Sequence, residues 1–209
     1  MAVAYEYDGT LYLAITRRCT LACVFCPKLR GRWTVAGNDM SRDGEPTLKE
    51  LIYCAESVGL ARYQRVAFVG LGEPTLRLDL VIEVGRLLRS KGHHVRLVTD
   101  GLASLRAGRD VSAELADALD EVHVSLNAAD PETYARFCPS PFGASAHPAV
   151  CEFIRAARAH ISLVKATVVA LPDLDLRACE RLASSLGVPL RVRPYFPPQD
   201  GNPHDRPER

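Results

Sequence analysis

Three cysteines stand close together in the stretch RRCTLACVFCPK, at positions 19, 23 and 26 of a chain with seven cysteines. A disulfide, a zinc site, a redox dithiol and an iron–sulfur cluster are the four chemical explanations. Structural zinc normally takes four ligands, but the nearest further Cys or His residues are Cys54, His93 and His94. A CxxC dithiol needs two thiols and leaves Cys19 unexplained. Three thiolates suit a four-iron cluster held at three corners, with one iron open to a small molecule.

The bulk composition favours one cytoplasmic domain. The chain has 209 residues, 47% of them apolar, and a net charge of +1, which points to neither a nucleic-acid nor a membrane partner. The start MAVAYEYDGT lacks the basic and apolar regions of a signal peptide, and no apolar run reaches membrane-spanning length. Disulfides are rare in the cytosol, so the location and the odd cysteine count both weaken the disulfide explanation.

Short β-branched runs alternate with helical patterns along the chain. Strands are expected at Leu11–Thr16, Val66–Gly70, Val95–Thr99, Val122–Asn127, Leu163–Val169 and Leu190–Arg193. Helices are expected from Thr47, whose spacing to Glu50 is that of a capping box, and from Leu80 to a stop at Gly92. Further helices are expected at Ser112–Leu119, Asp130–Phe137, Ala149–His160 and Asp175–Leu186. This alternation predicts a parallel α/β sheet, curved or doubly wound.

Several of these strands are apolar on one face only. His123, Ser125 and Asn127 share one face of their strand, and Lys165 shares a face with Thr167, as Arg191 does with Arg193. Strands covered by helices on both sides are apolar on both faces, so the pattern favours a partial (β/α)6 TIM-like barrel with helices outside and a polar cavity inside. The alternative is that these side chains lie at strand ends or on an edge. We expect this domain to span residues 1–196, with a disordered Pro-rich tail at 197–209.

The spacing CxxxCxxC with Phe25 before the last cysteine resembles the signature of radical S-adenosylmethionine (SAM) enzymes. Three further segments fit that pattern: GLGEPTLR after the second strand, TDG after the third and SLNAADPETY after the fourth. In detail the chain is most similar to the short radical SAM proteins called TatD family-associated, for which we know of no established reaction.

The resemblance implies a mechanism. Cys19, Cys23 and Cys26 would hold a [4Fe–4S] cluster whose open iron binds SAM, and an electron from flavodoxin or ferredoxin would cleave SAM to a deoxyadenosyl radical. That radical would abstract hydrogen from an unidentified, anionic small molecule, while the protein orients both and excludes water. The first alternative is an activating enzyme that makes a glycyl radical on a partner protein. The second is a zinc-binding interaction module without enzymatic activity.

The resemblance also implies roles for other residues. Phe25 would stack near the adenine, Gly72 would allow close backbone approach, and Glu73 would fix its loop or meet the SAM ammonium. Ser125 and Asn127 are expected to contact the ribose, unless Asn127 is a helix cap, and Thr99 and Asp100 are further candidates. Asp100 stands where many members have Asn. Among Lys165, Arg191 and Arg193, we expect Arg193 to pair with the SAM carboxylate, which leaves a surplus cation for an anionic substrate.

The remaining cysteines divide into two groups. Cys54, Cys151 and Cys179 lie among apolar residues and are expected to be small core side chains. Cys138, in RFCPSPFG, is the candidate catalytic residue, as a radical relay or thiol donor. The long segment Lys28–Pro46 carries cations and Trp33 and is expected to close over the substrate or dock the electron donor, unless it is a plain surface loop.

Overall fold

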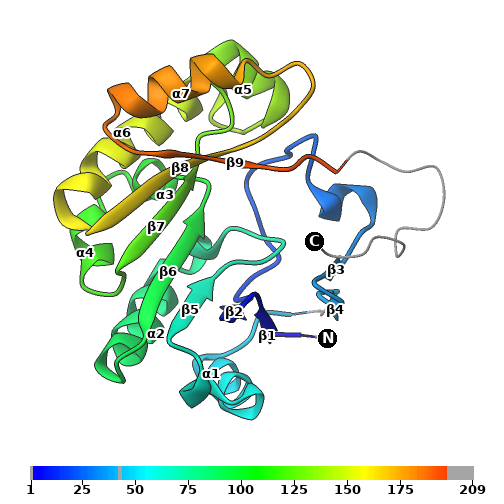
Figure 1. The fold of residues 1–209 in the computed structure, drawn as a ribbon, viewed down its shortest axis with the longest axis vertical. Coiled ribbons are helices and arrows are strands. Elements are labelled where there is room, and N and C mark those ends of the chain that lie inside the picture. Colours follow the sequence, from blue (N-terminus) through cyan, green and yellow to red (C-terminus); the bar gives the residue numbers. More distant parts are fainter. Residues whose placement is uncertain (1, 42–43, 197–209) are drawn as a thin grey trace.

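A seven-stranded sheet forms the centre of the computed structural model, which describes residues 2–41 and 44–196 (Figure 1). In sheet order the strands are β1 (Ala4–Tyr7), β2 (Thr10–Leu13), β5 (Arg65–Phe68), β6 (His94–Thr99), β7 (Glu121–Ser125), β8 (Leu163–Val169) and β9 (Leu190–Arg193). Six strands of this sheet, β2, β5, β6, β7, β8 and β9, pair in parallel, and each corresponds to one of the six expected strands. The predicted partial barrel of parallel strands is therefore confirmed.

The strand β1 was not expected from the sequence. It pairs antiparallel with β2 and extends the sheet by one edge strand. The turn between them is Asp8–Gly9, and both residues have positive φ, at 48° and 66°. An Asp-Gly pair between two short apolar and aromatic runs is a hairpin signal, because its primed turn matches the twist of the strands.

Seven α-helices connect the strands within the described residues: α1 (Leu48–Val58), α2 (Leu78–Ser90), α3 (Ala103–Ala107), α4 (Ser112–Ala116), α5 (Pro131–Phe137), α6 (Ala146–His160) and α7 (Leu176–Ser185). The capping box of Thr47 and Glu50 forms as predicted, and Gly92 follows the end of α2 with φ at 86°. The short helix α3 was not predicted. The expected helix at Ser112–Leu119 ends early, at Ala116, because a turn brings the chain back to β7.

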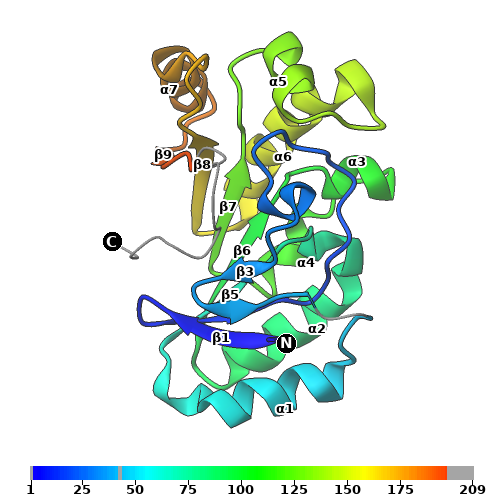
Figure 2. The ribbon, with the colours of Figure 1, turned by 90° about the vertical axis from the view of Figure 1, so that its right-hand side faces the viewer.

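The helices lie on the outer face of the sheet. Figure 1 shows α2, α4 and α6 on one side of the sheet and the loop that carries β3 (Thr34–Val35) and β4 (Asn38–Asp39) on the other. In Figure 2 this loop lies in front of the sheet. The outer face is packed with apolar side chains such as Val122, Val124 and Ala166, all 0% exposed. The inner face is left for polar groups and for the loop, which is the arrangement that a ligand cavity requires.

A polar layer closes the lower half of the inner face. The Glu121 carboxylate accepts a hydrogen bond from Lys165 Nζ at 2.9 Å and contacts His123 Nε2 at 2.7 Å and His94 Nε2 at 3.3 Å. Lys165 is therefore engaged below the cavity. The predicted polar interior is real, but its residues divide between this layer and the cavity above it.

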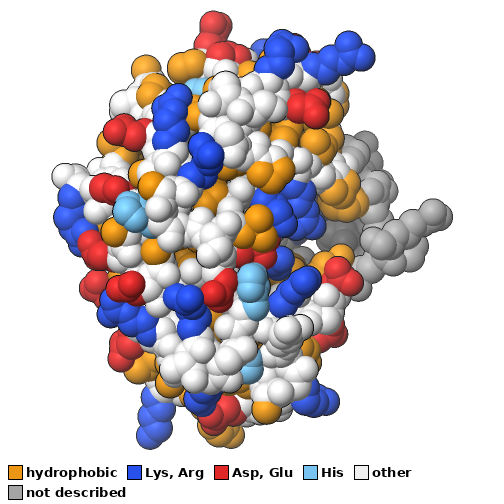
Figure 3. All heavy atoms as spheres, turned by 60° about the vertical axis from the view of Figure 1, so that its left-hand side comes forward, with side chains coloured by type: hydrophobic (Ala, Val, Ile, Leu, Met, Phe, Trp, Pro, Cys, Tyr) orange, Lys and Arg blue, Asp and Glu red, His pale blue; other side chains and the backbone are white. Residues whose placement is uncertain are grey.

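The tail predicted at 197–209 lies outside the described residues. In the part of the chain that the structure describes, no helix is both long and apolar enough to cross a bilayer. Acidic and basic side chains are interspersed over the face drawn in Figure 3, in keeping with the small net charge.

Candidate functional site

The three clustered cysteines lie in the connection that follows β2, at the carboxyl ends of the parallel strands. All three are half-buried and face a cavity of about 560 Å³, together with Phe25. Cys19 Sγ accepts a hydrogen bond from the Leu21 amide at 3.4 Å, yet burial raises its pKa to about 12. Because a metal binds the thiolate, cluster binding at this site would release protons. Among the described residues, no three His, Cys, Asp or Glu side chains are already grouped to hold a single metal ion.

The loop after β5 fixes the start of this cysteine segment. The Glu73 amide donates a hydrogen bond to the Arg18 carbonyl at 2.8 Å. A Cβ on Gly72 would collide with the Thr16 carbonyl oxygen and would come within 2.8 Å of the Arg18 carbonyl oxygen. Glycine is therefore required because two backbones pack against each other here, which is a structural reason besides the ligand approach predicted from the sequence.

The Glu73 carboxylate joins two strand ends and is 3% exposed. It accepts hydrogen bonds from the Thr75 amide (2.9 Å) and hydroxyl (2.6 Å), from the Thr99 hydroxyl (2.8 Å) and from the Asp100 amide (2.6 Å). Burial, followed by the nearby Asp100 carboxylate, raises the pKa of Glu73 to about 7. Glu73 was expected either to fix its loop or to meet the SAM ammonium. The hydrogen bonds in the structure are those of the first role, because they hold the loops after β5 and β6 together.

Arg106 is a residue of the site that sequence reasoning missed. Its guanidinium binds both oxygens of Asp100, at 2.8 and 3.1 Å, and lies 3.9 Å from Glu73. It also donates hydrogen bonds to the hydroxyls of Thr20 and Thr75. The cluster segment and the loops after β5 and β6 are thus tied through one cation. No motif marks Arg106, because its place depends on the unpredicted helix α3.

Ser125 and Asn127 line the cavity at the end of β7. Asn127 is 2% exposed and has a positive φ of 58°, and its Oδ1 is buried without a hydrogen-bond partner. Its Nδ2 donates to Cys138 Sγ at 3.3 Å. The alternative role as a helix cap belongs to Asp130, which accepts from the Thr133 amide at the start of α5.

Cations gather on the side of the cavity that β9 forms. Arg191 and Arg193 line it from the sheet, and three further cations line it from the long loop: Lys28, Arg30 and Arg32. Burial and the neighbouring Arg191 lower the pKa of Arg193, whose Nε is buried without a hydrogen-bond partner. By contrast, the carboxylates of Glu73 and Asp100 are already bound within the protein. The cavity is therefore electropositive at this side and suits an anionic group.

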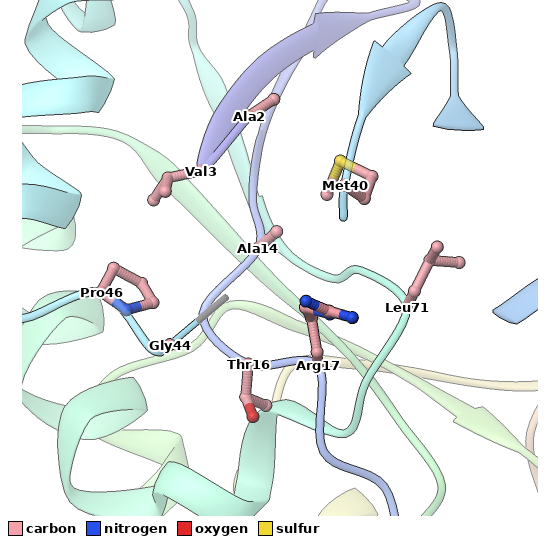
Figure 4. Close-up of a pocket in the computed structure, with 9 residues that line it drawn as sticks. All are labelled: Ala2, Val3, Ala14, Thr16, Arg17, Met40, Gly44, Pro46 and Leu71. Atoms are coloured by element: carbon pink, nitrogen blue, oxygen red, sulfur yellow. The ribbon is translucent and has the colours of Figure 1, made fainter. Parts of the chain in front are cut away.

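The long loop is anchored at Arg17, at the start of the cysteine segment. Arg17 stacks on Trp33 at 4.1 Å from the ring centroid and donates a hydrogen bond to the Ser41 carbonyl at 2.7 Å. Lys28 Nζ donates to the Arg17 carbonyl at 2.8 Å. Behind this loop, Arg17 and Met40 face a second pocket of about 20 Å³, room for about one water molecule (Figure 4).

The residues around the large cavity fit the two cofactors that the sequence resemblance implies. Three cysteines line the cavity. Two buried polar atoms of its lining residues, Asn127 Oδ1 and Arg193 Nε, have no hydrogen-bond partner. An acceptor and a cationic donor are what a ribose hydroxyl and a carboxylate need. The volume also lies in the range of ligand pockets. Cys138 is 0% exposed and does not line the cavity, but it lies against Cys23.

Comparisons with known proteins agree with this geometry. The model of the family described as the radical SAM superfamily matches residues 13–186. A probable GTP 3',8-cyclase of Methanopyrus kandleri is 32% identical over 198 residues, 89% of this chain and 58% of that protein. The GTP 3',8-cyclase of Streptomyces coelicolor is 32% identical over 79% of this chain and 46% of its own. This chain thus spans about half the length of these curated relatives.

Solved structures show the same fold at low sequence identity. Methylornithine synthase superposes with a TM-score of 0.62 at 16% identity, over 93% of this chain and 55% of that one. HydG, a maturase of the [FeFe]-hydrogenase, gives a TM-score of 0.63 at 14% identity, over 94% and 45% of the two chains. The finer likeness to TatD family-associated proteins is not tested by these matches and stays a prediction.

Proposed function

Because this chain belongs to the radical SAM superfamily of enzymes, whose cofactors are a [4Fe–4S] cluster and SAM, we propose that it abstracts hydrogen from an anionic small molecule held in the large cavity. The observation that carries the proposal is that one cavity is lined both by three cysteines from the connection after β2 and by Arg191 and Arg193 from β9. When bound, the cluster and SAM supply a radical able to remove a hydrogen atom.

We assign the following roles to the protein's own residues. Cys19, Cys23 and Cys26 hold the cluster, and the Gly72–Glu73 backbone lies beside the SAM methionine. Phe25 stacks near the adenine, while Ser125 and Asn127 bind the ribose, with Asn127 Oδ1 free to accept a hydrogen bond. Thr99 and Asp100 position other residues of the site instead of touching the cofactor, because the Thr99 hydroxyl binds Glu73 and the Asp100 carboxylate binds Arg106.

Arg193 is our candidate partner for the SAM carboxylate. Its buried Nε has no hydrogen-bond partner, so a carboxylate there would satisfy it. Arg191 and the loop cations then remain for the substrate. A nucleoside triphosphate fits that charge, and GTP is the first compound to test, because the relatives named GTP 3',8-cyclases cover most of this chain at about one-third identity.

The loop favours a small substrate over a protein partner. Lys28, Arg30 and Val35 come from the long loop and line the cavity, so the loop covers a bound molecule. A glycyl-radical activating enzyme must instead admit a polypeptide segment, and we keep it as the second candidate. Reduction by flavodoxin or ferredoxin and a cytoplasmic location also stay proposals.

Anaerobic reconstitution tests the proposal. We expect about four irons and four sulfides per chain, and formation of deoxyadenosine when the reduced protein meets SAM. GTP should bind the SAM-loaded protein by calorimetry and raise deoxyadenosine formation. If the protein takes up iron but GTP has no effect, GTP is rejected as the substrate and the rest of the proposal stands. Stoichiometric zinc with no iron uptake and no deoxyadenosine would reject the radical enzyme and favour the interaction module.

A further inference from the structure

Cys138 lies directly opposite Cys23 in a short antiparallel pairing. The Ala22 amide donates to the Pro139 carbonyl and the Val24 amide donates to the Phe137 carbonyl, both at 2.9 Å. These bonds pair residue 22 with 139 and residue 24 with 137, which leaves 23 and 138 as the intervening pair. Such a pair, without hydrogen bonds of its own, has its Cα atoms about 4.5 Å apart and its side chains close together.

The environment of the two sulfurs agrees with this register. Asn127 Nδ2 donates to Cys138 Sγ at 3.3 Å, which holds that sulfur in place. The Cys23 and Cys138 thiols are close enough to interact. A disulfide needs Cα atoms about 4.4 to 6.8 Å apart, and the ordinary spacing of such a pair falls within that range.

We propose that Cys23 and Cys138 form a reversible disulfide when no cluster is bound. Two S–H bonds break and one S–S bond forms, while two electrons and two protons pass to an oxidant such as a diazene or a second disulfide. The bridge removes Cys23 from the set of thiols that the proposed function assigns to the cluster. The oxidised, cluster-free protein then cannot take up iron until a thiol reductant reduces the disulfide.

The pairing is specific to Cys138 among the cysteines outside the cluster segment. Cys151 is buried in α6 and Cys179 is buried in α7, both on the outer side of the sheet, and Cys54 lies in α1. Buried core thiols of this kind are inert packing groups. Cys138 differs from these three because it faces another thiol, that of Cys23, which is half-buried and lines the cavity.

Peptide mapping of the cluster-free protein tests the proposal. The protein is treated with diamide, whose N=N bond becomes a hydrazine, then alkylated and cut with trypsin. We expect residues 19–28 linked to residues 137–155 as the main product, with fragment ions that place the bridge at Cys23 and Cys138. The Cys151→Ser variant should keep the bridge, and Cys138→Ser should lose it. A bridge within Cys19, Cys23 and Cys26, or a Cys138 that remains a free thiol and is alkylated, overturns the proposal.

Iron loading separates this proposal from the proposed function. After diamide, the wild type should take up less than a tenth of its normal iron, and dithiothreitol should restore it. The untreated Cys138→Ser variant should load iron as the wild type does. If the reduced wild type takes up no iron, the cofactor assignment fails but the mapped bridge still decides this inference. If the disulfide forms and iron uptake is unchanged, the proposal that the disulfide blocks cluster assembly is wrong.

Discussion

The Thr99 hydroxyl donates a hydrogen bond to the Glu73 carboxylate at 2.8 Å and so joins the end of β6 to the loop after β5. The same carboxylate accepts the Asp100 amide at 2.6 Å. Glu73 therefore determines how two neighbouring strand ends sit beside the cysteine segment. A residue that the resemblance assigns to the cofactor is also a structural link between the loops that bind it.

Glu73 should make the protein less stable as the pH rises toward neutrality. Its pKa is about 7 in the folded protein against an ordinary value of 4.5, so its contribution is full below about pH 4.5 and is lost by about pH 7. In Glu73→Gln this loss disappears. The wild type's free energy of unfolding, relative to the variant's, should fall by at most about 3 kcal/mol over that interval.

Urea unfolding at several pH values measures this difference. The matched control is Glu83→Gln, an exposed residue of α2, which should leave the pH dependence of the wild type unchanged. Parallel curves for the wild type and Glu73→Gln would show that Glu73 has no raised pKa.

Glu121 should have the opposite pH dependence. Burial acts to raise its pKa, but the hydrogen bonds from Lys165 and His123 outweigh burial and hold it at about 2. Its stabilising contribution is present above about pH 4.5 and is lost as the pH falls through 2. Glu121→Gln should be roughly 1–3 kcal/mol less stable at pH 7 and should lack this acid-induced loss. An acid unfolding midpoint equal to that of the wild type would contradict the assignment.

Gly72→Ala should disturb the cysteine segment. The new methyl group meets the Thr16 and Arg18 carbonyls, which are backbone atoms that cannot rotate away. We expect a loss of roughly 1–3 kcal/mol in unfolding free energy. Iron uptake on reconstitution should fall with it.

Gly92→Ala is the matched control for that substitution. Gly92 precedes β6, whereas Gly72 follows β5, and a Cβ on Gly92 has nothing within 4 Å, although its φ is 86°. It should lose about 1 kcal/mol from backbone strain and keep its iron uptake. Equal iron uptake in the two variants would show that the close packing at Gly72 does not position the cysteines.

Arg191→Gln should weaken binding of an anionic ligand. Arg191 lines the cavity from β9, and its loss removes one cation near the ligand's charge. We expect the Kd for GTP, or for tripolyphosphate as a simpler probe, to rise about tenfold, since charge-assisted hydrogen bonds contribute about 1.5–3 kcal/mol. The control Arg181→Gln, exposed on α7 outside the cavity, should bind as the wild type does. Equal affinities for all three proteins would place the anion elsewhere.

The fold was predictable where one strand and one helix alternate in a local pattern. The runs VRLVT and LVKATVV formed strands close to the expected bounds, and Thr47 capped α1 through Glu50 as expected. The hairpin of β1 was missed because AYEY is short, although Asp8–Gly9 marked its turn. The helix α3 was missed because five residues are too few for a helical period to show.

The sequence by itself determined the cysteine spacing, the GLGEPT segment and the alternation of polar and apolar residues along the strands, because each is a property of neighbouring residues. Only the tertiary structure decided that Arg106 binds Asp100, that Lys165 binds Glu121 below the cavity, and that Cys138 lies opposite Cys23. These pairs are distant in sequence or depend on loops. They form because parallel strands bring their ends together on one edge of the sheet, and no local pattern carries that information.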